Sequence, residues 1–295
     1  MAGSQRLLHR HGAGVTPAPV SARAVRGRLA LKAEADERGQ TVLTERIHQG
    51  AFHLSKPYWD GNVLMVQWIN PTAGIFAGDV LESRVRVGSG ASLLVTTPSA
   101  TRIHTRTSPD QPAGQQHQHF QVAAGGWLEV QPEWLIPQRG SAFSQSTHIE
   151  VEQGGALFYA ELLAPGRFAH GESLVFDRLD LRTRLSVGGQ VIAQERLLAG
   201  APDRLWMLAS REGTPMFSAT LWLVLPEVGR QAAGIVRECL TAAAECESGV
   251  AVLPNGVLGI RLLAARGMAI RSVMASLRAR LAKSCKALRT SMRKL

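Results

Sequence analysis

The feature that most constrains the fold is a phrase that recurs four times in the middle of the chain. It consists of alternating residues, then one or two glycines, then a second apolar or alternating run. Its occurrences are VRVGSGASLLV from Val85, FQVAAGGWLEV from Phe120, IEVEQGGALFYA from Ile149 and RLSVGGQVIA from Arg184. Alternation marks a strand with one buried face, and glycine permits tight connections. The chain is therefore predicted to be mainly β, with stacked or helically wound sheets, as in a β-helix or a sandwich.

The chain is long enough for one large or two ordinary domains, since it has 295 residues and 45% of them are hydrophobic. Residues 1–24 are rich in small residues and proline and are predicted to be a mobile tail. Residues 25–225 are predicted to form a β-rich domain. Residues 226–295 are predicted to be a C-terminal α/β segment that packs on it and contains most of the few helices.

Three features indicate a cytoplasmic protein without a membrane partner. No apolar run approaches the ~20 residues of a membrane helix, and no continuous apolar stretch follows the first basic residues, as a secretory signal requires. The three cysteines are an odd number and form no CxxC pair, which argues against a disulfide framework or a zinc site. They are Cys239, Cys246 and Cys285.

The end of the chain combines an apolar stripe with a basic surplus. From Met268 onwards, apolar residues recur at intervals of three, four and seven, which predicts an amphipathic helix. Its candidates for docking a partner are Ile270, Met274, Leu277 and Leu281. Ten basic residues and no acid follow Glu247, and they equal the net charge of +10 of the whole chain. Such a tail suits nucleic acid, an anionic membrane or an acidic protein, or is a solvated helix face.

The loop NPTAGIFAGD, from Asn70 to Asp79, is marked by glycines and ends on an acid. It lacks the Lys-Ser/Thr ending of a phosphate loop and does not fit G-x-G-x-x-G. It also lies between two strand candidates, NVLMVQWI and VLESRVRV, whereas a phosphate loop leads into a helix. Nucleotide binding is therefore rejected, and Gly74 and Gly78 are expected to allow a sharp turn. Asp79 is either a cap for backbone N–H groups or a carboxylate that faces an internal polar passage.

Several segments together carry a resemblance to a known family. They are NPTAGIFAGDVLESRVRVGSGASLLVTTPSATRIHTR (70–106), GGWLEVQPEWLIP, LLAPGRFAHGE, QERLLAG and LPNGVLGIRLLA. Their order and spacing, from about Gly27 to the C-terminus, resemble those of the urease accessory proteins of the UreD family, also called UreH. Each motif alone is weak, and their order carries the resemblance.

The resemblance implies a protein that assembles another enzyme and catalyses nothing itself. Proteins of this family bind apo-urease, recruit a UreF-type accessory protein and a UreG-type GTPase, and aid nickel delivery to the dinickel site of urease. The expected function is therefore that of a nickel-insertion chaperone, with a β-rich fold. No tightly bound cofactor is expected, only transient nickel, which accepts imidazole, carboxylate and water ligands.

Three acids are candidates for the metal path, namely Asp79, Glu129 and Glu172. Arg102 is a candidate partner for Asp79. Glu129 lies among apolar neighbours in WLEVQP, so it is expected to pair with a base such as Arg102 or Arg167. Glu172 in GRFAHGE either pairs with Arg167 or lines the same passage.

Other interpretations stay open from the sequence alone. His117 and His119 form an HxH that is a weak candidate for a metal site, and His9 and His11 are weaker still. One alternative function is a basic nucleic-acid-binding protein, although no aromatic residue interleaves the basic run. Another is a β-sandwich carbohydrate hydrolase that uses Asp79 and Glu129 as its carboxylate pair.

Overall fold

The computed structural model describes residues 24–200, 210–211 and 214–291. Within these ranges seven strands form a first sheet, in the order β15-β14-β12-β9-β6-β1-β2. They are β1 (Arg26–Ala35), β2 (Thr41–Gln49), β6 (Val80–Val87), β9 (Gly114–Val122), β12 (Ala142–Val151), β14 (Arg178–Val187) and β15 (Gln190–Gly200). The predicted mobile tail and its two histidines lie almost wholly outside the described residues.

The described strands also form a second, eleven-stranded sheet, whose main path is β19-β20-β18-β13-β10-β7-β5-β3. Those strands are β3 (His53–Leu54), β5 (Val63–Ile69), β7 (Ser92–Thr96), β10 (Trp127–Gln131), β13 (Ala156–Leu163), β18 (Phe217–Val224), β19 (Glu247–Val252) and β20 (Leu258–Ala264). Beside this path lie β4 (Tyr58–Asp60), β8 (Thr101–Ile103) and β11 (Leu135–Pro137). A separate small pair comprises β16 (Ser210–Arg211) and β17 (Thr214–Pro215).

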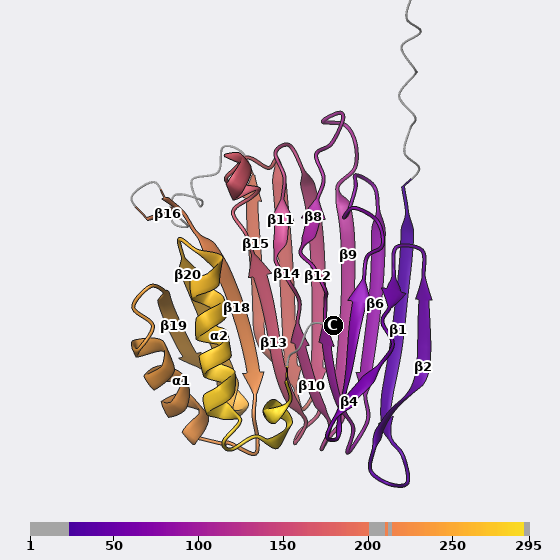
Figure 1. Ribbon diagram of the computed structural model, residues 1–295, viewed down its shortest axis with the longest axis vertical. Helices are drawn as coiled ribbons and strands as arrows, with labels where there is room; N and C mark the ends of the chain where they lie inside the picture. The colour runs from indigo at the N-terminus through magenta and orange to yellow at the C-terminus, as the bar shows by residue number, and fades with distance from the viewer. Residues whose placement is uncertain (1–23, 201–209, 212–213, 292–295) are drawn as a thin grey trace, which may run out of the picture.

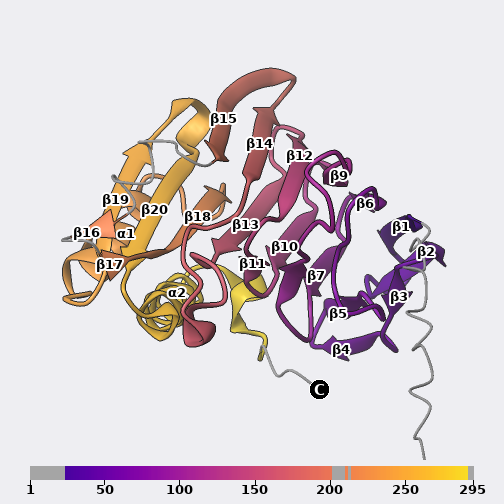
Figure 2. The same ribbon diagram turned by 90° about the horizontal axis from the view of Figure 1, so that it is seen from above.

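The chain winds between the two sheets (Figures 1 and 2). It passes from β5 in the second sheet to β6 in the first, then to β7 in the second and β9 in the first, and so on to β14. Successive strands within each sheet are therefore parallel, as in the pairs β6–β9 and β7–β10. The prediction of a mainly β chain with helically wound, stacked sheets is confirmed.

The recurring glycine phrases are the turns of this winding. Three of them carry the chain from the first sheet to the second, and their backbones stack on one another. The amide of Gly90 donates to the carbonyl of Gly125 at 3.2 Å, and Gly125 donates to Gly154 at 3.1 Å. Each of these glycines has a φ between 71° and 85°, which other residues rarely adopt. The fourth phrase differs, because Gly188 and Gly189 form a hairpin between β14 and β15 in one sheet.

The inward residues of the winding strands build the main core between the sheets. Val87, Val122, Val151 and Val187 stand in register across four parallel strands of the first sheet. All four are buried, together with aromatic side chains such as Phe120. The period of two in the sequence thus becomes an apolar layer that excludes water.

Two helices cover the outer face of the second sheet (Figure 2). They are α1 (Gln231–Thr241) and α2 (Gly267–Leu281), and short 3-10 turns lie at η1 (Phe168–His170), η3 (Pro254–Gly256) and η4 (Lys286–Arg289). Neither helix within the described ranges is both long and apolar enough to cross a lipid bilayer.

The prediction that the apolar stripe of α2 is an exposed docking surface is wrong. Its residues Ile270, Met274, Leu277 and Leu281 are at most 5% exposed. They pack against the apolar outer side of β18 and β20, since that side of the second sheet needs a cover. The stripe is therefore core, which a helical period alone cannot distinguish from an interface.

Half of the ten basic residues in the C-terminal segment form ion pairs that the structure describes. Five of its arginines form ion pairs with acids among the described residues. The pairs are Arg261–Glu195, Arg266–Glu245, Arg271–Glu133, Arg278–Glu129 and Arg280–Glu238. The tail is thus not a free basic arm, because folding distributes its charge over acids elsewhere in the chain.

Candidate functional site

The loop 70–79 connects β5 in the second sheet to β6 in the first, so it joins strand to strand as predicted. Its centre is anchored by Ile75, whose amide donates to the carbonyl of Arg102 at 2.8 Å and whose carbonyl accepts from the amide of His104 at 2.9 Å. The ring of Phe76 stacks on the ring of His104 at 4.1 Å. The loop therefore closes one end of the space between the sheets.

Asp79 caps this loop with both of its carboxylate oxygens. Its Oδ1 accepts a hydrogen bond from the amide of Val25 at 2.7 Å, and its Oδ2 accepts from the amide of Phe76 at 2.8 Å. The residue is only 3% exposed. Within the described ranges no ion pair joins Asp79 to Arg102, whose side chain is exposed, so the expected partnership is not formed. As a metal-path residue Asp79 stays a prediction.

We expect Asp79→Ala to lower the free energy of unfolding by about 1–3 kcal/mol, because the partly buried amides of Val25 and Phe76 lose their acceptor. Asp79→Asn should cost less, because its single amide oxygen can still accept from one of the two N–H groups. Urea denaturation of the two variants and the parent checks this. If Asp79→Ala unfolds at the same midpoint as the parent, the carboxylate is not a structural cap.

Glu129 lies on the outward side of β10, beneath α2, and is 0% exposed. Arg278 binds it with two donors, Nε to Oε1 at 2.7 Å and Nη2 to Oε2 at 3.1 Å. The same guanidinium donates to the carbonyl and the hydroxyl of Thr290, both at 2.6 Å. Burial raises the pKa of Glu129, and the guanidinium opposes this rise. The expected partners, Arg102 and Arg167, are therefore wrong, although a buried acid in this strand does have a basic partner.

Glu172 follows η1 and pairs with Arg167, which was one of its two expected roles. The guanidinium Nε donates to Oε2 at 2.8 Å, and the amide of Arg139 donates to the same oxygen at 3.3 Å. These bonds, above all those from Arg167, lower the pKa of Glu172 to about 2. The three candidate acids therefore do not converge, because each is bound by different protein donors at a different place in the fold.

A polar cluster that the sequence prediction missed lies between the sheets. Glu161 on β13 accepts a hydrogen bond from the side-chain amide of Gln145 on β12 at 2.7 Å. The hydroxyl of Tyr159 donates to the same carboxylate at 3.5 Å. The hydroxyl of Thr147 bonds the side-chain oxygen of Gln118 at 3.0 Å, which extends the cluster to β9. These side chains all stand at inward positions, among the apolar residues of the main core.

The cluster reaches the open side of the sandwich through a second acid. Glu195 on β15 forms an ion pair with Arg261 on β20, and the backbone registers of β13, β18 and β20 bring Arg261 close to Glu161. Glu161 keeps part of its surface accessible. Burial raises its pKa to about 7, and the nearby charge of Glu195 adds to this rise. The group is thus poised to exchange a proton near neutral pH.

A local signal for this cluster existed in the sequence. In ALFYAELL the period of two places Tyr159 and Glu161 on the same face as the apolar residues Leu157 and Leu163. A polar side chain at an inward position of an alternating strand predicts either a satisfied network or a lined passage. Only the folded structure shows which partners it meets, because Gln145 lies on β12 in the opposite sheet.

Comparison with known proteins identifies the family of this chain. A family model described as UreD urease accessory protein matches residues 25–294. The chain belongs to the UreD family of urease accessory proteins. It is 37% identical to the urease accessory protein UreD of Opitutus terrae, over 91% of this chain and 98% of that relative. It is 32% identical to the protein of that name from Cupriavidus necator, over 81% and 83% of the two chains.

Membership of the UreD family confirms the resemblance drawn from the ordered motifs. The family is named for assisting urease and not for a reaction of its own. The geometry also argues against the carbohydrate hydrolase. Its two supposed catalytic acids are buried and have different partners, since backbone amides bind Asp79 and Arg278 binds Glu129. A glycosidase needs both carboxylates free in one cleft.

The HxH lies on the outer face of the first sheet. His117 Nδ1 is 2.8 Å from the hydroxyl of Ser146, and His119 Nε2 is 3.4 Å from Glu150. Within the described part of this UreD-family chain, no group of three or more His, Cys, Asp or Glu side chains could hold a metal ion. His9 and His11 lie outside the described residues.

Proposed function

We propose that this protein is a nickel-insertion chaperone for urease. It would act in the cytoplasm as a scaffold that links apo-urease to a UreF-type protein and a UreG-type GTPase, without catalysing a reaction. Family membership supports the link to urease. The observation that carries the metal step is the polar cluster around Glu161, which lies between two otherwise apolar sheet faces.

The chemistry of the cluster suits a cation in transit. Carboxylate, hydroxyl and amide oxygens from three strands are spread along the space between the sheets. Nickel accepts oxygen ligands, and dispersed ligands hold it more weakly than a closed set of imidazoles or thiolates. Burial raises the pKa of Glu161 to about 7, so near neutral pH a proton competes with a cation for this carboxylate. The bonds from Gln145 and Tyr159 both end on Oε2 of Glu161. In Asp79, Glu129 and Glu172, by contrast, both carboxylate oxygens accept from protein donors. The proposed path therefore runs through Glu161.

We expect Glu161→Gln to reduce nickel delivery to urease without destabilising the fold. The folded pKa of about 7 exceeds the ordinary value of 4.5, so the contribution of Glu161 to stability is fully present below pH 4.5 and is lost as pH rises through 7. The variant lacks this loss, so at pH 8 it should be as stable as the parent or more stable by about 1–3 kcal/mol. Urease made by co-expression with the variant should nevertheless contain less nickel and be less active.

The experiment measures three quantities, namely the unfolding midpoint, recovery of the complex with urease and the nickel content of urease. Glu152→Gln is a matched control, because Glu152 is an exposed acid on the turn after β12. Nickel content that is unchanged in Glu161→Gln contradicts the proposed path. Loss of the complex itself would show that the cluster supports assembly and not metal transfer.

A further inference from the structure

The outer face of the first sheet has no helix packed on it among the described residues (Figure 2). Its outward side chains alternate with buried ones such as Val85 and Leu185, so their direction follows from the strand period. We call this surface the basic face. Its described basic residues are Arg28, Lys32, Arg84, Arg86, Arg178, Arg182, Arg184 and Arg196, and its acids are Glu34, Glu45, Glu82, Glu150 and Asp180.

Positive charge on the basic face exceeds what its own acids can compensate. Asp180 is nearly buried beneath three arginines, with Arg182 Nη2 at 2.8 Å, Arg196 Nε at 2.9 Å and Arg178 Nη2 at 3.4 Å. These bonds, led by that from Arg182, hold the pKa of Asp180 well below its usual range, so one negative charge faces three positive ones. The cluster is therefore a fixed cationic site on a rigid strand pair.

Two further arginines of the basic face are free to bind a partner. Arg84 on β6 and Arg184 on β14 are exposed, and neither forms an ion pair with another described residue. An exposed guanidinium held on a strand keeps five N–H donors available for carboxylates. Such unpaired cations on the face of a sheet are suited to an external anionic group.

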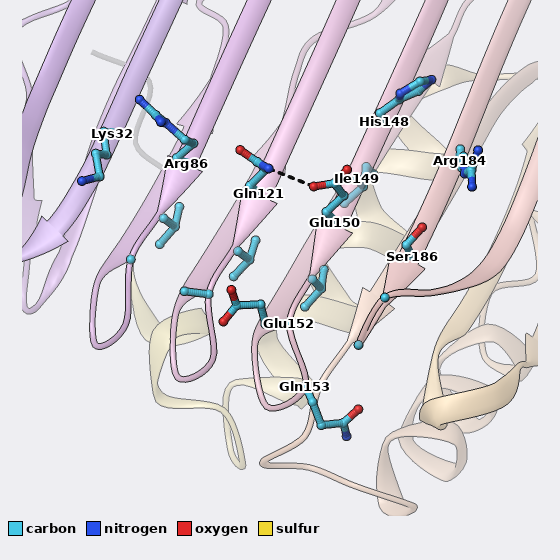
Figure 3. A pocket seen from close by; sticks show the side chains of 17 residues that line it. Lys32, Arg86, Gln121, His148, Ile149, Glu150, Glu152, Gln153, Arg184 and Ser186 are labelled. Carbon is cyan, nitrogen blue, oxygen red and sulfur yellow. Dashed lines mark hydrogen bonds between the residues drawn. The ribbon is translucent and has the colours of Figure 1, made fainter.

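The basic face is also hollowed. One hollow of about 760 Å³ lies between Lys32, Arg86, His148 and Arg184, as Figure 3 shows. A second, of about 470 Å³, is lined by Arg28 and Arg84. Arg86 and His148 border both hollows, so the two lie side by side on the basic face.

We propose that the basic face docks an acidic protein surface. Charge complementarity favours a partner rich in Asp and Glu, whose carboxylates meet Arg84, Arg184 and the cluster on Asp180. The interspersed acids of the face, such as Glu82 and Glu150, match cations on a protein but repel the uniform phosphates of nucleic acid. No Phe, Tyr or Trp stands among the outward residues of the described strands of the first sheet, so this face offers no aromatic side chain on which bases could stack. The proposal does not depend on the metal path.

The test measures binding of a fluorescein-labelled 20-residue poly-L-glutamate to the full chain by anisotropy at about 0.15 M salt, where the Debye length is about 8 Å. The double variant Arg84→Gln/Arg184→Gln should bind about tenfold more weakly, which corresponds to ~1.4 kcal/mol. The control Arg230→Gln/Arg237→Gln removes the same charge from exposed positions at α1, on the opposite side of the molecule. It should change the affinity less than about twofold, since distant exposed charges are screened. Thermal melting should show that both variants fold as the parent does.

Three outcomes would overturn the proposal. Equal weakening by the control variant would show that only net charge attracts the probe. Tighter binding of a single-stranded oligonucleotide with the same number of charges would assign the face to nucleic acid. An affinity that is unchanged in Arg84→Gln/Arg184→Gln would show that the face is not the binding surface.

Discussion

Replacing Arg278 by leucine is expected to lower the free energy of unfolding by about 3–5 kcal/mol, because it leaves the charge of Glu129 buried and unpaired. Glu129 has no exposed surface, and Arg278 supplies two hydrogen bonds to it. The same change releases the bonds that hold Thr290 against α2. Urea denaturation at pH 7 measures the loss. The loss should shrink as pH falls towards 4.5, because a protonated Glu129 no longer buries a charge.

The double variant Glu129→Leu/Arg278→Leu should recover most of this loss, since an apolar pair leaves no buried charge behind. Arg280→Leu is the matched control on the same helix. Arg280 forms an exposed ion pair with Glu238 at the long distance of 3.7 Å. Its removal should therefore change the free energy of unfolding by less than about 0.5 kcal/mol. A cost for Arg278→Leu as small as that of Arg280→Leu would mean that the buried pair does not fasten α2 to the second sheet.

Gly74→Ala is expected to cost about 2–4 kcal/mol, from backbone strain and from overlap in a packed loop. Gly74 has a φ of 150°, and a Cβ there would overlap the carbonyl oxygen of Arg102 and lie 2.9 Å from Nε2 of His104. The carbonyl of Arg102 cannot move away easily, because it accepts the hydrogen bond from Ile75. Thermal or urea unfolding of the variant measures the cost.

Gly61→Ala is the control that separates backbone strain from steric overlap. Gly61 also has a positive φ, 61°, but a Cβ there would have no neighbour within 4 Å, so only the backbone strain of ~1 kcal/mol applies. Gly78→Ala should fall between the two, since its φ is 79° and the nearest atoms would be side-chain carbons at 3.3 Å. If Gly74→Ala costs no more than Gly61→Ala, the loop yields and its close approach to Arg102 is not a constraint.

The sequence alone determined the local structure and the family. Its period of two identified the strands, and its glycines identified the turns. These features depend on neighbours in the chain, because side-chain direction in a strand and positive φ are properties of a few consecutive residues. The order of several weak motifs was enough to recognise the UreD family, which comparison with its members confirmed.

Only the tertiary structure decided what each residue meets. The glycine turns carry the chain between two sheets in three cases and reverse it within one sheet in the fourth, although the phrases look alike. Glu129 was singled out as a buried acid, but its partner Arg278 lies 149 positions away, and Glu161 was missed altogether. The apolar stripe of α2 is core because an apolar sheet face happens to lie opposite it. Such pairings depend on long-range packing, and no local spacing records which distant strand or helix will supply the matching charge or apolar surface.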